Sequence, residues 1–334
     1  MPSAASGGPT VAVLGASGFA GALAARLLWQ HPHFELVAVT SRSDAGRRLD
    51  DLYPHHRVPL VMDAYDPDEL GQVDAAVVAY PHGAAAPTVA ALRERGIRVV
   101  DLSADFRLRD VAVYEEWYVE HPVPQLIGEA VYGLPELYRD RLRDATIVAG
   151  PGCFPTAAIL GLAPLAPHLA DVVIDAKTGV SGAGRAATEK THFVSVAENV
   201  KPYGIGRHRH APEIDQELAA LGARDLVATF TPHLLPLDQG ELLSCYATLT
   251  EDVDVHALYR ERYADEPFVE VVDAPPGVRE VRETNFCRIL VHPDERTGKV
   301  FVFSAIDNLW KGTASQAVQC LNLMFGFDET AGIG

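Results

Sequence analysis

A glycine-rich turn close to the N-terminus restricts most strongly how this chain can fold. Val11–Leu14 is a short apolar run, and Gly15, Gly18 and Gly21 follow it with the spacing G-x-x-G-x-x-G. An apolar run that ends at glycine is typical of a buried strand, and the apolar residues after Gly18 recur at helical spacing. Glycine lets the backbone approach a pyrophosphate, and the following helix N-terminus offers N–H donors to it. The turn therefore predicts the start of a dinucleotide-binding domain, although tight packing without a ligand would also require these glycines.

The same alternation continues to about residue 150. Further strands are expected at Glu35–Ser41, Val73–Ala79, Val99–Leu102 and Ile147–Ala149, with a second helix over Ala84–Arg95. Strands that alternate with helices predict a parallel sheet covered on both faces, and so a Rossmann-type α/β domain.

A chain of 334 residues exceeds one ordinary core, so two domains are expected. The second should be a mixed α+β catalytic domain, because closely spaced strands follow one another beyond about residue 170. The expected boundaries are 1–152 for the dinucleotide-binding domain, to which a C-terminal helix in 311–334 returns, and 153–310 for a catalytic and oligomerisation domain. The strands expected in the second domain are Val172–Lys177, Leu226–Thr231, Leu242–Thr250, Phe268–Val272, Phe286–His292 and Val300–Ser304.

The charge balance limits the classes of molecule that the protein is expected to bind. Lysine and arginine number 28 against 45 acidic residues, which gives a net charge of −17. A surface this acidic repels phosphate backbones and anionic membranes, so neither nucleic acid nor a membrane is expected as a partner. An anionic small substrate would need a locally basic pocket. The N-terminus lacks a basic region and an apolar core, so we expect no signal peptide and a cytoplasmic location.

The end of the second expected strand bears on the choice of nicotinamide cofactor. NAD-binding domains usually have an acidic residue there, whereas this chain has hydroxyls and a guanidinium at Ser41, Arg42 and Ser43. Such groups suit a 2′-phosphate and favour NADP over NAD. Asp44 is close enough to keep NAD possible, and Arg42 could instead be a solvated surface residue.

Cys153 stands out among four cysteines, none of which forms a C-x-x-C pair. It follows Gly150-Pro151-Gly152, between an apolar strand and an apolar helix. At a helix N-terminus the dipole favours the thiolate, and the same N–H groups can stabilise an oxyanion. Cys153 is therefore the candidate nucleophile, and the other three cysteines are expected to be inert and buried.

Two histidines flank Arg209 in a glycine-rich stretch. An imidazole with a pKa near neutrality can shuttle protons, which makes His208 and His210 candidates for acid–base chemistry. As an H-x-H pair they could bind a metal, but further ligands are lacking and no metal is expected. Four other histidines in the N-terminal part carry no motif and are expected at the surface. They are His31, His33, His55 and His56.

Six short motifs are spread in order over nearly the whole chain. They are Gly15-Ala-Ser-Gly-Phe-Ala-Gly21, Leu102-Ser-Ala-Asp-Phe-Arg107, Tyr132-Gly-Leu-Pro-Glu136, Ser181-Gly-Ala-Gly-Arg185, His208-Arg-His-Ala-Pro-Glu-Ile214 and Ala305-Ile-Asp-Asn-Leu-Trp-Lys-Gly312. With the Cys153-Phe-Pro-Thr run, they resemble the N-acetyl-gamma-glutamyl-phosphate reductase family of arginine biosynthesis, in the wider aspartate-semialdehyde dehydrogenase group. Trp310 departs from the family pattern, in which a smaller apolar residue is commoner.

The resemblance implies an NADPH-dependent, phosphorylating aldehyde dehydrogenase. Its substrate would be N-acetyl-glutamyl 5-phosphate, its products the semialdehyde and phosphate, and its intermediate a thioester on Cys153. His208 would be the acid–base group. Arg107 would hold the leaving phosphate, unless it is only an ion-pair partner of Asp105 or Asp110. A homodimer or homotetramer is implied as well.

The resemblance also implies two sets of binding residues. Those for the substrate are Arg107, Arg185, Arg209 and His210, of which His210 could also orient its loop or cap the next helix. Those for NADP(H) are Gly15, Ser17, Gly18, Phe19, Ala20, Gly21, Ser41, Arg42, Ser181, Gly182, Gly184, Asn308 and Lys311.

Other functions stay open at this point. A related reductase could act on a carrier-bound aminoadipyl phosphate or on aspartyl phosphate. A cysteine–histidine hydrolase would cleave its substrate without oxidising NADPH. A non-catalytic nucleotide sensor would keep its function after loss of Cys153.

Overall fold

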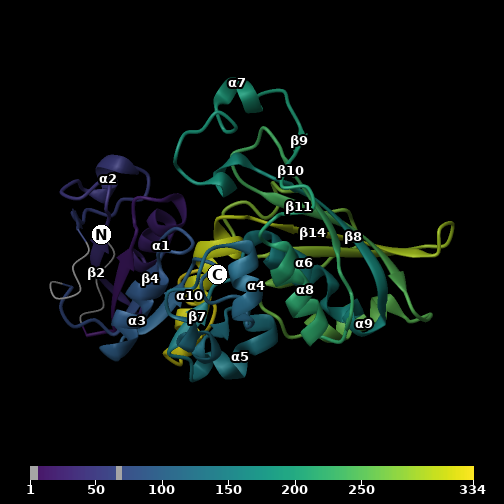
Figure 1. The fold of residues 1–334 in the computed structure, drawn as a ribbon, viewed down its shortest axis with the longest axis horizontal. Helices are drawn as coiled ribbons and strands as arrows, with labels where there is room; N and C mark the ends of the chain where they lie inside the picture. Colours follow the sequence, from purple (N-terminus) through teal and green to yellow (C-terminus); the bar gives the residue numbers. More distant parts are fainter. Residues whose placement is uncertain (1–6, 65–69) are drawn as a thin grey trace. The chain divides into compact units, whose positions relative to one another are not determined.

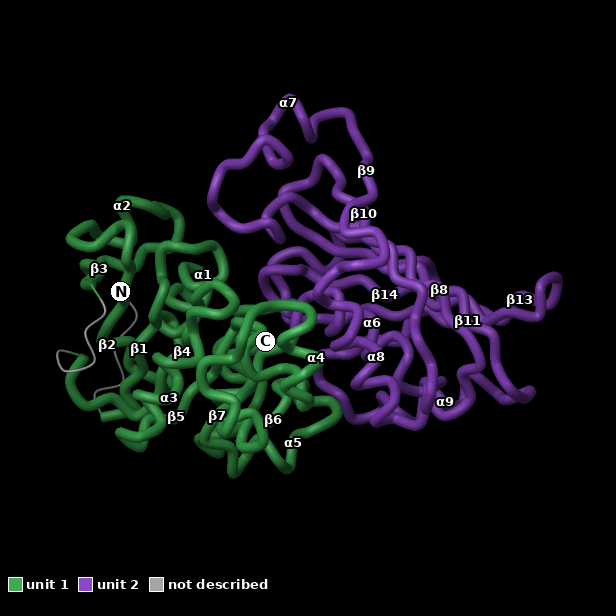
Figure 2. Tube along the Cα trace, in the orientation of Figure 1, with its two compact units in different colours: residues 1–151, 313–334 green, residues 152–312 purple. Residues whose placement is uncertain are grey.

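The structure, a computed structural model, describes residues 7–64 and 70–334. It divides into two compact units (Figure 2). Unit 1 comprises Met1–Pro151 and Thr313–Gly334, and unit 2 comprises Gly152–Gly312. No helix in the described part of the chain is long and apolar enough to cross a membrane.

Unit 1 is built on a seven-stranded sheet with the order β3-β2-β1-β4-β5-β7-β6. Its paired strands all run parallel, so their carboxyl ends share one edge. The central strands are apolar on both faces because helices cover both, and every residue of β4 is buried. The strands are β1 Thr10–Leu14, β2 Glu35–Thr40, β3 Met62–Asp63, β4 Ala75–Val78, β5 Arg98–Asp101, β6 Val131–Tyr132 and β7 Ile147–Ala149.

The helices of unit 1 include the returning C-terminal helix, which packs against α1 and α5. A π-helix over Trp310–Ala314 leads into that helix. The α-helices are α1 Phe19–Trp29, α2 Leu49–Leu52, α3 Ala86–Glu94, α4 Val111–Trp117, α5 Pro135–Arg143 and α10 Ser315–Met324. A parallel sheet with helices on both faces confirms the predicted Rossmann-type fold (Figure 1).

Unit 2 carries a mixed sheet with the order β12-β13-β14-β11-β8-β10-β9. Of the strand pairs described in this sheet, only β8 with β10 and β12 with β13 run parallel. This confirms the predicted mixed α+β fold. The strands are β8 Leu169–Thr178, β9 Lys201–Pro202, β10 Thr229–Leu234, β11 Glu241–Leu249, β12 Val269–Val271, β13 Cys287–Asp294 and β14 Lys299–Ile306.

Helices pack on one face of this mixed sheet (Figure 1). Helix α6 lies against β11 and β14, α8 packs on α6, and α9 lies against β12 and β13. Along β14, Val300 and Val302 are buried, whereas Phe301 and Phe303 are only partly covered on the opposite face. The helices of unit 2 are α6 Cys153–Leu162, α7 Phe193–Val196, α8 Ala211–Ala220 and α9 Val255–Tyr263.

Candidate active site

Cys153 is the first residue of α6. The preceding Gly152 is extended, and its N–H donates to the Glu213 carboxylate at 2.9 Å. Its carbonyl accepts the N–H and the hydroxyl of Thr156, at 2.9 and 3.0 Å. These bonds fix the turn that places Cys153 at the helix N-terminus, where the dipole favours a thiolate.

The four cysteines differ in exposure. Cys153 is partly exposed, whereas Cys245, Cys287 and Cys320 are buried. Burial raises the pKa of Cys245 to about 12. A buried thiol that stays protonated is a poor nucleophile, so exposure and helix position single out Cys153.

The two histidines of the predicted acid–base motif lie together. The rings of His208 and His210 are 4.9 Å apart, and each makes an edge contact with Phe154. The backbone N–H of His210 donates to the ring nitrogen Nδ1 of His208 at 3.2 Å. A Cβ built on Gly152 would lie 2.6 Å from Nε2 of His210, so this imidazole packs on the residue before Cys153. His210 is the N-cap residue of α8, but its side chain makes no capping hydrogen bond.

The charge of His208 follows from its surroundings. Burial and the neighbouring Arg209 lower the pKa of His208 to about 4. The imidazole is therefore neutral at pH 7. Because Nδ1 accepts the His210 N–H, the proton of the neutral ring is on Nε2.

The glycine-rich turn of unit 1 has the geometry of a phosphate cradle. Gly15 has a φ of +87°, and a Cβ there would lie 2.5 Å from the Ala79 carbonyl oxygen. A Cβ on Gly21 would lie 2.3 Å from the carbonyl oxygen of Gly15, so both positions need glycine for packing. At Gly18 a Cβ would meet only that oxygen, at 3.7 Å. No side chain caps the N-terminus of α1, so its first-turn N–H groups can receive a phosphate.

The candidate residues for binding the ribose of the cofactor lie at the carboxyl end of β2. Ser41 is buried, and its hydroxyl donates to the Ser17 hydroxyl at 2.8 Å. Arg42 is exposed. The carboxylate of Asp44 is buried and accepts bonds from Ser43 and Arg47, at 2.6 and 3.0 Å.

Arg107 is buried near the carboxyl ends of β5 and β7. Its guanidinium donates to the carbonyl oxygens of Gly150 and Leu102, at 2.7 and 2.8 Å. The Asp105 carboxylate accepts N–H groups of Gly83, Ala85 and Ala86 at the start of α3. These contacts fix the guanidinium close to the start of the turn that leads to Cys153.

Of the other predicted binding residues in unit 2, some are buried and some are exposed. Asn308 holds the small-residue loop, because its amide donates to the Ser181 hydroxyl at 3.0 Å and accepts the Gly240 N–H at 2.7 Å. Lys311 is fully buried, with Nζ 5.8 Å from the ring centroid of Phe268. Arg185 and Arg209 are exposed.

Sequence reasoning missed two buried carboxyl groups in unit 2. Glu213, inside the histidine motif, holds Gly152 as described above. Glu241 begins β11 and is fully buried near the Cys153 thiol. Glutamate usually lies at the surface, and only the fold shows that these two do not.

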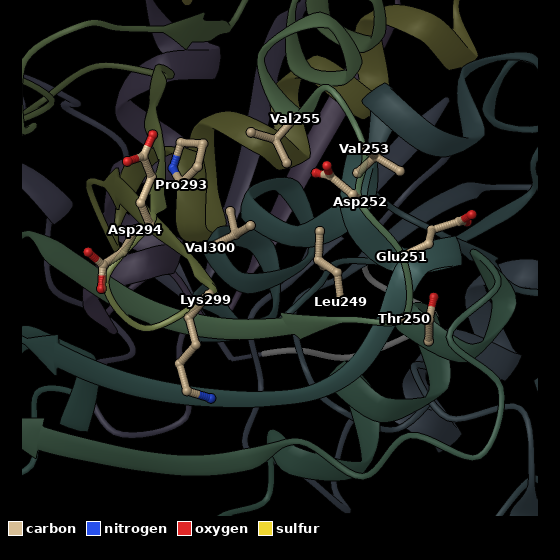
Figure 3. Close-up of a pocket in the computed structure, with 12 residues that line it drawn as sticks. Leu249, Thr250, Glu251, Asp252, Val253, Val255, Pro293, Asp294, Lys299 and Val300 are labelled. Atoms are coloured by element: carbon tan, nitrogen blue, oxygen red, sulfur yellow. The ribbon is translucent and has the colours of Figure 1, made fainter.

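A separate cavity of ≈ 390 Å³ lies at the far end of β11 (Figure 3). Valines and leucine line it together with Glu251, Asp252, Asp294 and Lys299. It carries no cysteine or histidine, so it offers neither a nucleophile nor an imidazole base. Among the described residues, no three His, Cys, Asp or Glu side chains are grouped as metal ligands would be.

Comparison with known proteins adds independent support for the fold and the family. A model of the semialdehyde dehydrogenase NAD binding domain matches residues 10–145, and one of the semialdehyde dehydrogenase dimerisation domain matches residues 153–308. The N-acetyl-gamma-glutamyl-phosphate reductase of Desulforudis audaxviator is 49% identical, with 97% of each chain covered. The reductase of the same name from Moorella thermoacetica is 48% identical, over 95% of this chain and 96% of that protein.

Solved structures agree at the level of the fold. Aspartate semialdehyde dehydrogenase II from Vibrio cholerae matches with a TM-score of 0.74 at 18% identity, over 96% of this chain and 99% of that one. The aspartate semialdehyde dehydrogenase from Francisella tularensis matches with a TM-score of 0.71 at 15% identity, over 95% of this chain and 100% of that one.

Proposed function

The chain belongs to the N-acetyl-gamma-glutamyl-phosphate reductase family of semialdehyde dehydrogenases, and we propose that it performs this reduction with NADPH through a thioester on Cys153. The observation that carries the proposal is the position of Cys153. It is the partly exposed cysteine of the chain, at the N-terminus of a ten-residue helix. The alternatives of a hydrolase and a sensor lack such support from relatives.

The reaction begins with the Cys153 thiolate. Sγ attacks the acyl carbon of N-acetyl-gamma-glutamyl phosphate, so that a C–S bond forms and the C–O bond to the phosphate breaks. NADPH, when bound, would supply the hydride that reduces the resulting thioester. The tetrahedral adduct then loses the C–S bond, which releases the semialdehyde and returns the thiolate. Backbone N–H groups at the start of α6 stabilise the oxyanion of each tetrahedral species.

His208 is proposed as the acid–base group toward the substrate. In the free enzyme its ring is neutral and carries its proton on Nε2. An anionic acyl phosphate beside the ring favours the imidazolium and raises the pKa of His208. The protonated ring can then give the departing phosphate the proton that the overall reaction consumes. His210, against Gly152, is proposed to orient the turn and the substrate.

Phosphate binding is assigned to Arg107, because an arginine fixed by two carbonyl bonds presents a preorganised cation. The exposed Arg185 and Arg209 are proposed to bind the anionic groups of the substrate. The two arginines of unit 2 would thereby give this acidic chain a locally basic region for an anionic ligand.

The residues of the cradle fit a nicotinamide dinucleotide, which the matched NAD binding domain supports. Gly15, Ser17 and the first turn of α1, Phe19 and Ala20 included, would hold the pyrophosphate. NADP is favoured over NAD because Arg42 is exposed at the end of β2, whereas the Asp44 carboxylate is committed to Ser43 and Arg47. Ser181, Gly182, Gly184, Asn308 and Lys311 are proposed for the nicotinamide side.

A homo-oligomer is proposed as the working form, because residues 153–308 match a dimerisation domain. The partly covered face of the mixed sheet, defined by Tyr246, Leu290, Phe301 and Phe303, is the proposed contact. We call this set the open face.

The proposal is tested by phosphate-dependent reduction of NADP with the semialdehyde. Cys153→Ser should lose nearly all turnover while still binding NADPH, and Cys245→Ser should stay active. Arg42→Ala should weaken NADPH binding and leave NADH binding nearly unchanged, whereas Arg224→Ala, at an exposed arginine of unit 2, should leave both unchanged. Acyl-phosphate cleavage without NADPH oxidation would establish the hydrolase instead, and an active Cys153→Ser variant would exclude the thioester.

A further inference from the structure

Three aromatic rings from separate parts of unit 2 contact the imidazole of His208. Its ring centroid lies 5.6 Å from that of Phe154, 5.4 Å from that of Tyr203 and 5.3 Å from that of Phe230. The planes meet at 79°, 68° and 74°, so each contact has the edge-to-face geometry that aromatic pairs prefer. The ring of His210 is a fourth neighbour, at 4.9 Å. We call Phe154, Tyr203 and Phe230 the aromatic enclosure.

The fold itself fixes the three rings of the aromatic enclosure. Phe154 is the second residue of α6 and Phe230 lies on β10. Both side chains are buried, and their rings meet edge to face at 5.3 Å. Tyr203 follows β9, and its backbone N–H donates to the Pro232 carbonyl oxygen of β10 at 3.0 Å. A helix, a strand and a loop therefore hold the rings in place before any ligand binds.

Backbone groups hold the imidazole against these rings. The backbone N–H of His210 donates to Nδ1 of His208 at 3.2 Å, and the His208 carbonyl oxygen accepts the Ala211 N–H at 3.0 Å. A Cβ built on Gly204 would lie 3.0 Å from Cδ2 of His208, and Gly204 has a φ of +58°, which favours glycine. The backbone thus packs directly on the imidazole. Since Nδ1 accepts a hydrogen bond, Nε2 is the nitrogen left to act on a substrate.

We infer that Phe154, Tyr203 and Phe230 are positioning residues for His208, which exclude water from its ring and keep the ring in one orientation. The inference rests on the proposed acid–base role of His208. An imidazole in apolar surroundings stays neutral until a neighbouring anion favours its protonation. The aromatic enclosure therefore makes the protonation of His208 depend on the anionic substrate and much less on the pH of the solution.

Burial by these rings is the main reason why the imidazole is neutral. It lowers the pKa of His208 to about 4, and the charge of the neighbouring Arg209 acts in the same direction with a smaller effect. The Tyr203 phenol stays protonated, because burial and the charges of Cys153 and Glu241 raise its pKa. The ionisable groups on the elements around the imidazole are Cys153, Tyr203, Arg209, His210, Glu213 and Glu241.

The test is the protonation of His208 in the full chain, followed by NMR with isotope-labelled histidine. The signals of His208 are those that are missing in His208→Asn. In the wild type the ring should stay neutral, with its proton on Nε2, from about pH 8 down to about pH 5. In Phe230→Leu and in Tyr203→Leu it should gain a proton between about pH 6.5 and 5, because water then stabilises the imidazolium. Phe286→Leu, the same change at a ring that packs on Phe268, should match the wild type.

Turnover in the phosphate-dependent assay gives a second readout. Both variants of the aromatic enclosure, Phe230→Leu and Tyr203→Leu, should lose roughly 3–10-fold in kcat, with KM for phosphate little changed. The reason is that a ring free to turn misplaces its nitrogen without removing a contact to the substrate. Tyr203→Phe keeps the aromatic ring and should restore most of the turnover that Tyr203→Leu loses.

Two results would overturn the inference. One is a His208 ring that titrates alike in the wild type and in both leucine variants, and the other is equal turnover of Tyr203→Phe and Tyr203→Leu. Tyr203 is only partly buried, so its variants test the aromatic enclosure even if Phe230→Leu does not fold. The titration uses neither acyl phosphate nor NADPH, so a failure of the proposed acid–base role would appear separately, as full turnover in His208→Asn.

Discussion

At the scale of single residues, Gly312 limits where the nucleophile Cys153 can lie. A Cβ built on it would lie 2.8 Å from Cβ of Cys153 and 3.3 Å from the Asp307 carbonyl oxygen. Since real Cβ atoms do not approach so closely, Gly312→Ala must displace Cys153. We expect turnover to fall by roughly 10-fold or more, as small misplacements of reacting groups cost about that much.

The matched control is Gly277→Ala in the same unit, where a Cβ would meet only Glu280, at 3.8 Å. Steady-state kinetics and thermal unfolding of both variants separate misplacement from unfolding. Equal turnover of the two variants would mean that Gly312 does not position the thiol.

Buried neutral histidines should make the protein sensitive to acid. Burial lowers the pKa of His56 to about 4, as it does for His208, whereas an unfolded histidine titrates near 6.5. The unfolded chain therefore binds more protons than the native one in this window, so stability should fall as the pH drops from about 6.5 to 4. Urea midpoints at pH 7 and 4.5 measure the loss.

His56→Gln should show a smaller acid loss than the wild type. His256→Gln, on the exposed surface of α9, should leave the loss unchanged. If both variants lose as much as the wild type, the acid sensitivity has another source.

The candidate site residues singled out from the sequence stand in local motifs, whereas the buried groups that the sequence missed depend on long-range packing. Cys153 is recognisable because Gly-Pro-Gly and an apolar helix surround it. The prediction that His31 and His56 are at the surface was wrong. His31 is buried because its Nε2 lies 2.8 Å from the Ala331 carbonyl oxygen, 300 residues away, and His56 because it stacks on Tyr53.

At the scale of elements, α8 supports the turn before α6. The Glu213 carboxylate, on α8, accepts the buried Gly152 N–H at 2.9 Å. Glu213→Ala removes this acceptor, and an unsatisfied buried N–H costs about 1–3 kcal/mol. We expect the free energy of unfolding to fall by about that amount, as measured by urea denaturation, and turnover to fall with it.

Glu213→Gln keeps an oxygen acceptor and should lose less stability than Glu213→Ala. Equal losses in the two variants would show that the charge of Glu213, and not its hydrogen bond to Gly152, supports the turn.

Most strands were predictable from the sequence, whereas several helices and the two-residue strands were not. The strands of three or more residues lie within a few residues of their expected positions, because buried strands in this chain are continuous apolar runs. Helices α4 and α5 escaped prediction, since their residues are mixed and α5 contains a non-helical residue, Tyr138. Strands of two residues, such as β9, are defined by their pairing partner and leave no periodic signal.

At the scale of the whole molecule, the mixed sheet of unit 2 should join two copies of the chain. On the open face, the rings of Tyr246 and Phe301 meet edge to face at 5.2 Å, while helices pack on the opposite face. Partly covered aromatic rings in adjacent strands form an apolar patch of the kind that protein interfaces bury.

Phe301→Glu would place a charge in that contact, and desolvating an unpaired carboxylate is costly. We therefore expect light scattering to show half the wild-type mass. Phe193→Glu, the same change on α7, where the ring is 80% exposed, should keep the full mass. If Phe193→Glu dissociates the protein and Phe301→Glu does not, then α7, and not the sheet, carries the contact.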